Sequence, residues 1–88
     1  MDVKQAVAIA TTYFQTVFPN YTRNLALEEV EFLPQNESWL VTLGYDKERQ
    51  VPPGVLRSLV PQNWERDYKV VHVDANGAPL SVKMREAS

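Results

Sequence analysis

The first segment of the chain repeats apolar residues at steps of three and four, which is the spacing of one face of an α-helix. The apolar residues are Val3, Ala6, Val7, Ala10, Tyr13, Phe14, Val17 and Phe18. Asp2 precedes them with Gln5 three residues later, a variant of the capping box, and Pro19 disfavours helical backbone at Phe18. The pattern predicts an amphipathic helix over 2–18, which must be held by burial because its threonines are poor helix formers.

Four later segments alternate apolar and polar residues, as strands with one buried face do. They span about 26–33, 38–45, 66–74 and 79–85. The second is the clearest, with Trp39, Val41, Leu43 and Tyr45 on one side and Leu40, Thr42 and Gly44 on the other. Asn76 and Gly77 favour a tight turn between the last two strands, which predicts a hairpin. The buried face of 66–74 stays open, because Val71 and Val73 compete with Tyr68, Val70 and His72.

The order of these elements predicts an α+β fold, in which one N-terminal helix packs on a four-stranded antiparallel sheet as a two-layer meander. A chain of 88 residues forms a single domain, 1–88. The connection 46–65 contains Pro52, Pro53 and Pro61 and a short apolar run, VLRSLV. Loops of this length are usually functional or mobile, so we expect an interaction surface there.

Composition narrows the possible functions. The chain has no cysteine and one histidine, so disulfides, thiol chemistry and cysteine-bound metals are excluded and we expect no metal or cofactor. With 9 basic and 11 acidic residues the net charge is −2, which argues against a nucleic-acid partner. No signal-peptide pattern and no long apolar segment is present in the sequence. We therefore expect a cytoplasmic protein that does not enter a membrane.

The charges are unevenly distributed along the chain. Residues 19–48 carry two basic and six acidic residues, and residues 49–88 carry six basic and four acidic ones. Glu28, Glu29 and Glu31 make one predicted strand acidic, and Lys83 and Arg85 lie at the end of the last strand. Either these two strands pair with each other, or an edge of one sign meets a partner, or a second copy, that carries the other sign.

Candidate catalytic groups are few. His72 lies in an alternating strand, where a half-buried histidine with local hydrogen bonds is the more frequent case. Asp46, Glu48 and Asp67 could converge across the long loop, but their spacing does not resemble a calcium loop, so solvated charges are favoured. No nucleophile motif or phosphate loop is present. We predict that the protein is not an enzyme; the alternative is a small-ligand-binding or enzymatic cone-shaped α+β domain with a pocket near His72.

The C-terminal sequence YKVVHVDANGAPLSVKM resembles the end of PepSY-type domains, which close with an apolar strand, an aspartate, a glycine-containing turn and a second strand. The initial helix with AVAIA and the strand of Trp39 fit the same plan, which belongs to the broader cystatin-like architecture. The connection 46–65 is longer than that plan has. The resemblance implies a non-catalytic, protein-binding role of the kind associated with the regulation or inhibition of peptidases.

We therefore expect a small non-catalytic module that binds a protein partner or a second copy as a homodimer; regulation or inhibition of a partner enzyme is one form of this role. The expected binding regions are the open sheet face and the 46–65 loop. The residues expected to bind are Leu40, Thr42, Val55, Leu56, Leu59 and Trp64. Trp39 is expected under the helix, whereas Trp64 either anchors a partner or folds back to seal the core.

Overall fold

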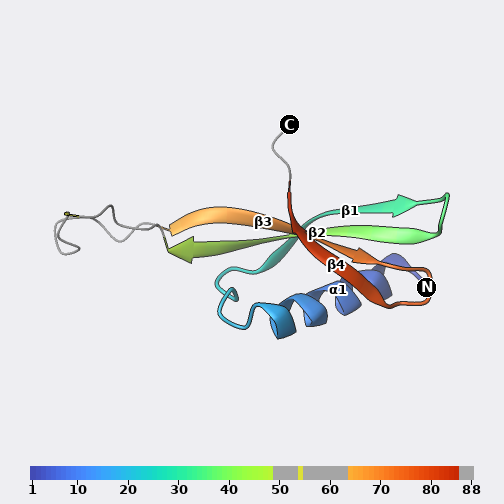
Figure 1. Cartoon of the computed structure of the whole chain (residues 1–88), viewed down its shortest axis with the longest axis horizontal. Helices are drawn as coiled ribbons and strands as arrows, with labels where there is room; N and C mark the ends of the chain where they lie inside the picture. Colours follow the sequence, from blue (N-terminus) through green and yellow to red (C-terminus); the bar gives the residue numbers. More distant parts are fainter. Residues whose placement is uncertain (49–53, 55–63, 86–88) are drawn as a thin grey trace.

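One helix lies against one face of a four-stranded antiparallel sheet (Figure 1). The structure is a computed structural model, and it describes residues 1–48, 54 and 64–85. The elements are α1 (Val3–Val17), β1 (Ala26–Leu33), β2 (Ser38–Glu48), β3 (Trp64–Val73) and β4 (Pro79–Met84). The strands follow one another across the sheet in the order β1-β2-β3-β4. The predicted α+β fold, in which one helix and a four-stranded antiparallel meander form two layers, is confirmed.

Helix α1 begins with the predicted capping box. The Asp2 carboxylate accepts the Gln5 backbone N–H at 2.9 Å, and the Gln5 side chain accepts the Asp2 N–H at 2.9 Å. At the other end, Phe18 leaves the helical conformation while its N–H still donates to the Phe14 carbonyl. The side chains that α1 buries completely are Ala6, Ala10 and Phe14. Small residues at two of these positions let the helix approach the sheet closely.

The core lies between α1 and the central strands, and it decides which face of β3 is buried. Val71 and Val73 are both 0% exposed, because Val71 pairs with Val41 and Val73 with Trp39 on the face below the helix. The aromatic residue at the centre of this core is Tyr45, whose ring lies 5.3 Å from that of Phe14. Trp39, expected under the helix, lies on this face, where it is half-buried, packs against the core and contacts Phe32 of the edge strand β1.

The hairpin of β2 and β3 is longer than predicted, which corrects the expected loop 46–65. β2 continues to Glu48 and β3 begins at Trp64, so that these two residues pair. Lys47 stabilises the added pairs, because its ammonium lies 3.7 Å from Glu65 and 3.5 Å from Asp67. The charged residues that looked like a loop therefore belong to strands. The rest of the expected loop, apart from Gly54, lies outside the described residues.

The turn between β3 and β4 is the tight reversal that the Asn-Gly pair predicts. The Asp74 carboxylate accepts the backbone N–H groups of Asn76 and Ala78 at 2.9 and 2.8 Å, and Gly77 has a φ of 85°. The expected strands 66–74 and 79–85 each end one residue earlier, at Val73 and Met84. β3 ends at Val73 because the Asp74 side chain accepts hydrogen bonds from the backbone of the turn, so Asp74 belongs to the turn and not to the strand.

Candidate functional site

We call the face of the sheet opposite α1 the open face. It is formed by the residues that alternate, along each strand, with the residues of the buried core. Its centre is a band of five residues from β2 and β3, which we call the central band: Leu40, Thr42, Tyr68, Val70 and His72. Leu40 pairs with His72, and Thr42 pairs with Val70. Thr42 is only 6% exposed, while the other four are half-buried. The predicted positions Leu40 and Thr42 therefore lie side by side on one surface.

Trp64 lies on the same face as Tyr68 and Val70, because side chains an even number of residues apart along a strand point to the same side. It is the first residue of β3 rather than part of a loop. Its ring is 39% exposed and is covered on one side by the Arg23 guanidinium, 4.0 Å from the ring centre. Val70 is six residue steps along β3 from Trp64, so the two Cα atoms are about 20 Å apart. Trp64 is thus exposed enough to contact a partner but lies at the far end of the open face.

The other predicted binding residues, Val55, Leu56 and Leu59, lie outside the described residues. Of the three carboxylates considered as a possible cluster, Asp46 and Asp67 do not converge. Asp46 lies on the open face, whereas Asp67 lies on the helix side, where it accepts the Tyr45 hydroxyl at 2.8 Å. Across residues 1–48, 54 and 64–85, no group of three His, Cys, Asp or Glu side chains is placed to hold a metal ion.

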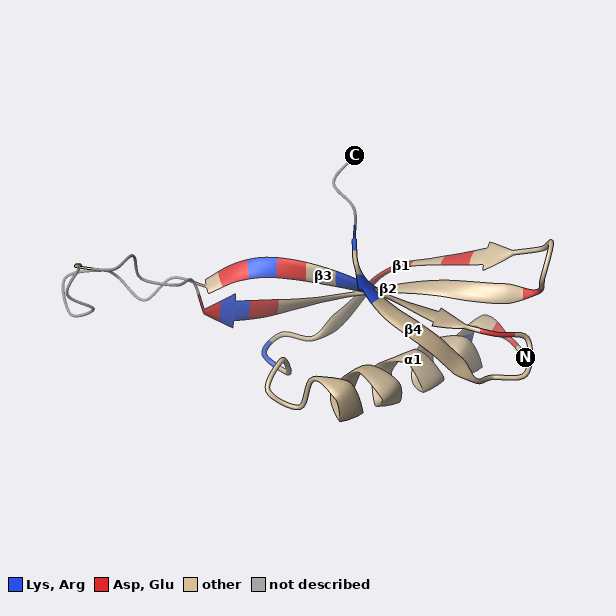
Figure 2. Ribbon diagram, in the orientation of Figure 1, with Lys and Arg blue, Asp and Glu red and all other residues tan. Residues whose placement is uncertain are grey.

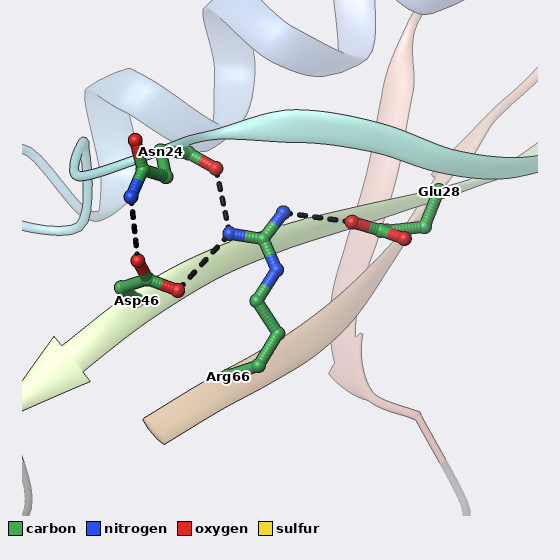
Figure 3. Close-up of polar contacts among 4 residues, drawn as sticks. All are labelled: Asn24, Glu28, Asp46 and Arg66. Carbon is green, nitrogen blue, oxygen red and sulfur yellow. Dashed lines mark hydrogen bonds and ion pairs between the residues drawn. The ribbon is translucent and has the colours of Figure 1, made fainter. Parts of the chain in front are cut away.

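A polar cluster that the sequence did not predict closes one end of the open face (Figure 3). Arg66 donates to the Glu28 carboxylate at 2.7 Å, to the Asp46 carboxylate at 3.2 Å and to the Asn24 carbonyl at 2.6 Å. Asn24 in turn donates from its side chain to Asp46 at 2.7 Å. This Asn24 bond, followed by the contacts with Arg66, lowers the pKa of Asp46 below its ordinary value. We call these four residues the Arg66 clamp.

The clamp depends on a bulge in β1. Leu27 pairs with Leu43 and Glu29 with Thr42, so Glu28 is an extra residue. The bulge directs the Glu28 side chain over Gly44, where a Cβ atom would lie 2.6 Å from the Glu28 carboxylate oxygen. The hydrogen bonds of the clamp join residues that are 20 to 42 positions apart in sequence, so no local pattern indicates it.

His72, at the end of the central band away from the Arg66 clamp, contacts Ser38 at the start of β2. Its Nε2 lies 2.9 Å from the Ser38 hydroxyl, and this hydroxyl donates to the Asn36 side chain at 2.6 Å. Because the Ser38 proton is directed to Asn36, the imidazole donates its own proton to Ser38 rather than accepting one. Ser38 is also 1% exposed. The contact ties the start of β2 to β3.

The two edges of the open face carry opposite charges (Figure 2). Glu29 and Glu31 lie on β1, and Lys83 lies on β4, beside Arg85, which follows that strand and stacks on Tyr68 at 4.0 Å. β2 and β3 separate these edges. Of the two alternatives considered for these charges, pairing of the acidic strand with the basic strand is therefore wrong, because the meander places them at opposite edges.

Grooves lie on the helix side. One, of about 460 Å³, is lined mainly by apolar atoms of α1 and by Pro79, and its α1 residues are Ala8, Ile9, Thr12, Tyr13 and Thr16. A second, of about 510 Å³, runs from Met1 and Gln5 to the turn at Asn76 and Gly77. His72 lines neither groove.

Comparison of the chain with protein-family models, curated proteins and solved structures finds no match. Among the described residues, no helix combines the length and the apolar character needed to cross a membrane.

Proposed function

We propose that the protein is a small non-catalytic module that binds a protein partner on the open face of its sheet. The observation that carries the proposal is the central band, in which apolar side chains and Thr42 lie between edges of opposite charge. An apolar centre with a charged rim is the usual anatomy of a protein interface. A compact antiparallel sheet with one helix also leaves a face of this kind available for docking.

Two further features support a binding role over catalysis. The exposed ring of Trp64, with Arg23 stacked on it, is of the aromatic and arginine type that anchors interfaces. The Ser38 and His72 contact is directed away from nucleophile activation. A ligand pocket near His72 is the alternative; His72 lines neither of the two grooves described above. Regulation of a partner enzyme, which the PepSY resemblance implies, would be one use of the open face.

Site-specific photo-crosslinking tests the proposal. A photoreactive amino acid replaces Leu40 on the open face and, as the matched control, Gln15 on the exposed side of α1. We expect an adduct of defined mass from position 40 and none from position 15. Excess wild-type chain should suppress the adduct, whereas excess Leu40→Lys chain should not. Equal adducts at both positions, or equal competition by both chains, would contradict docking on the open face.

A further inference from the structure

The partner that best fits the open face is a second copy of the same chain. We propose that two copies dock through their open faces, with the two-fold axis parallel to the strands. The proposal rests on the proposed function and deepens it by naming the partner. The observation that supports it is the order of residues across the open face, from the acidic edge on β1 through the central band to the basic edge on β4.

Two rows of paired residues cross the open face from β1 to β4. The first row is Glu29, Thr42, Val70 and Lys83, and the second is Glu31, Leu40, His72 and Ser81. Each row thus begins with an acid, passes through the central band and ends at a basic or neutral residue. Within the described residues, Glu29, Glu31 and Lys83 have no ion-pair partner in their own chain.

The charges select one of the two symmetric ways of stacking the faces. A two-fold axis parallel to the strands reverses the strand order, so β1 of one copy lies over β4 of the other and β2 lies over β3. Glu29 then faces Lys83 of the second copy twice over, and Thr42 faces Val70. An axis across the strands would instead place Glu29 against Glu29, which like-charge repulsion disfavours. The contact is isologous, so it closes at a dimer.

The geometry of sheet packing preserves this match. Aligned sheets pack about 10 Å apart with their strands rotated by about 30°. At the edge strands, about 7 Å from the axis, this rotation shifts the rows by roughly one residue, so Lys83 stays within reach of Glu29 or Glu31. Four strands about 4.8 Å apart and about 26 Å long give a face of about 500 Å² per copy, or about 1,000 Å² in total, which is at the lower end of specific interfaces. We therefore expect a reversible dimer with micromolar affinity that weakens as salt is added.

Charge reversal tests this arrangement. In Glu29→Lys the second copy's Lys83 meets a lysine, and in Lys83→Glu the second copy's Glu29 meets a glutamate. Each variant alone should dimerise at least about tenfold more weakly than the wild type, because two attractive pairs become repulsive. An equimolar mixture of the two variants should form a heterodimer, because both of its edge pairs are again complementary. Lys4→Glu, on the exposed start of α1, is the matched control and should dimerise like the wild type.

Sedimentation velocity over a concentration series up to about 1 mM measures the wild type, the two reversals, their mixture and the control. Recovery of dimer in the mixture supports the proposal and shows that both variants are folded. A wild-type chain that stays monomeric, or a dimer that both reversals leave unchanged, overturns it. In that case an adduct of another protein at position 40 would still support the open face as a docking surface, so the two proposals fail separately.

Discussion

Tyr45 both fills the core with its ring and makes a polar contact with its hydroxyl. Its ring is 1% exposed, and its hydroxyl donates to Asp67. Burial first, and then the Asp67 carboxylate, raises the pKa of the phenol above its ordinary value. Burial also opposes ionisation of Asp67. The hydrogen bonds from Tyr45 and from the Tyr68 N–H, together with Lys47 and Lys69, outweigh it and hold the pKa of Asp67 below 3.8.

This shift makes stability depend on pH at the acid end. A carboxyl with a lowered pKa in the folded state contributes its full stabilisation above its unfolded pKa, near 3.8. It loses that stabilisation as pH falls through the folded value. We therefore expect the unfolding free energy, measured by urea denaturation from pH 7 to pH 2, to fall below about pH 4. The fall should be smaller in Asp67→Asn, with a remainder from Asp46, whose pKa is also lowered.

Tyr45→Phe is the matched variant, because it keeps the ring and removes only the hydroxyl that donates to Asp67. It should reduce the acid-dependent fall, though less than Asp67→Asn does. If wild type and Asp67→Asn lost stability in parallel across this range, the assignment to Asp67 would be wrong.

At the scale of elements, the β1 bulge and the Arg66 clamp fix how β1 joins the sheet. The bulge sends Glu28 over Gly44, and the absence of a Cβ at Gly44 makes room for the ion pair of Glu28 with Arg66. A methyl group there would also lie 2.9 Å from Arg66 Nη2. The glycine and the clamp are therefore energetically coupled.

A double-mutant cycle measures that coupling. Gly44→Ala alone should lower the unfolding free energy by about 1 kcal/mol, because the ion pair must move. In a Glu28→Ala background the same change should be neutral or stabilising, since the Arg66 guanidinium is no longer held there by Glu28 and can move away, and glycine weakens a strand interior. Chemical denaturation of the four chains gives the interaction energy, expected at about 1 kcal/mol. Additive effects would contradict the coupling.

The helix and strands were easier to predict from the sequence than the ends of the strands and the contacts between them. The helix and the alternation of β2 were readable, because both patterns are local, and they placed Leu40 and Thr42 correctly together. The ends of the β2 and β3 hairpin were not readable, since Lys47 and Glu65 look like loop residues until they pair. The Arg66 clamp was also hidden, because its contacts span 20 to 42 residues and depend on a bulge with no sequence signal.

At the scale of the whole molecule, the two faces of the sheet have different roles. The helix side holds the buried core, and the open face holds the central band between an acidic and a basic edge. The meander keeps those edges apart within one chain, and in the proposed dimer each acidic edge would face the basic edge of the other copy. This arrangement accounts for a net charge of −2 that is the sum of unlike parts. It also makes the open face the surface on which a partner, and in particular a second copy, would dock.

Intermolecular paramagnetic broadening tests this docking most directly. Because the chain has no cysteine, Ser81→Cys provides a single nitroxide attachment point on β4, beside His72 on the open face. The labelled chain is mixed with ¹⁵N-labelled wild type, and amide signals of the wild type are recorded. We expect the strongest broadening at Glu31 and its neighbours in β1, with much weaker broadening on α1, which lies behind the sheet. Absence of broadening on the sheet, or broadening centred on α1 or on β4, would contradict docking of the open faces in the proposed orientation.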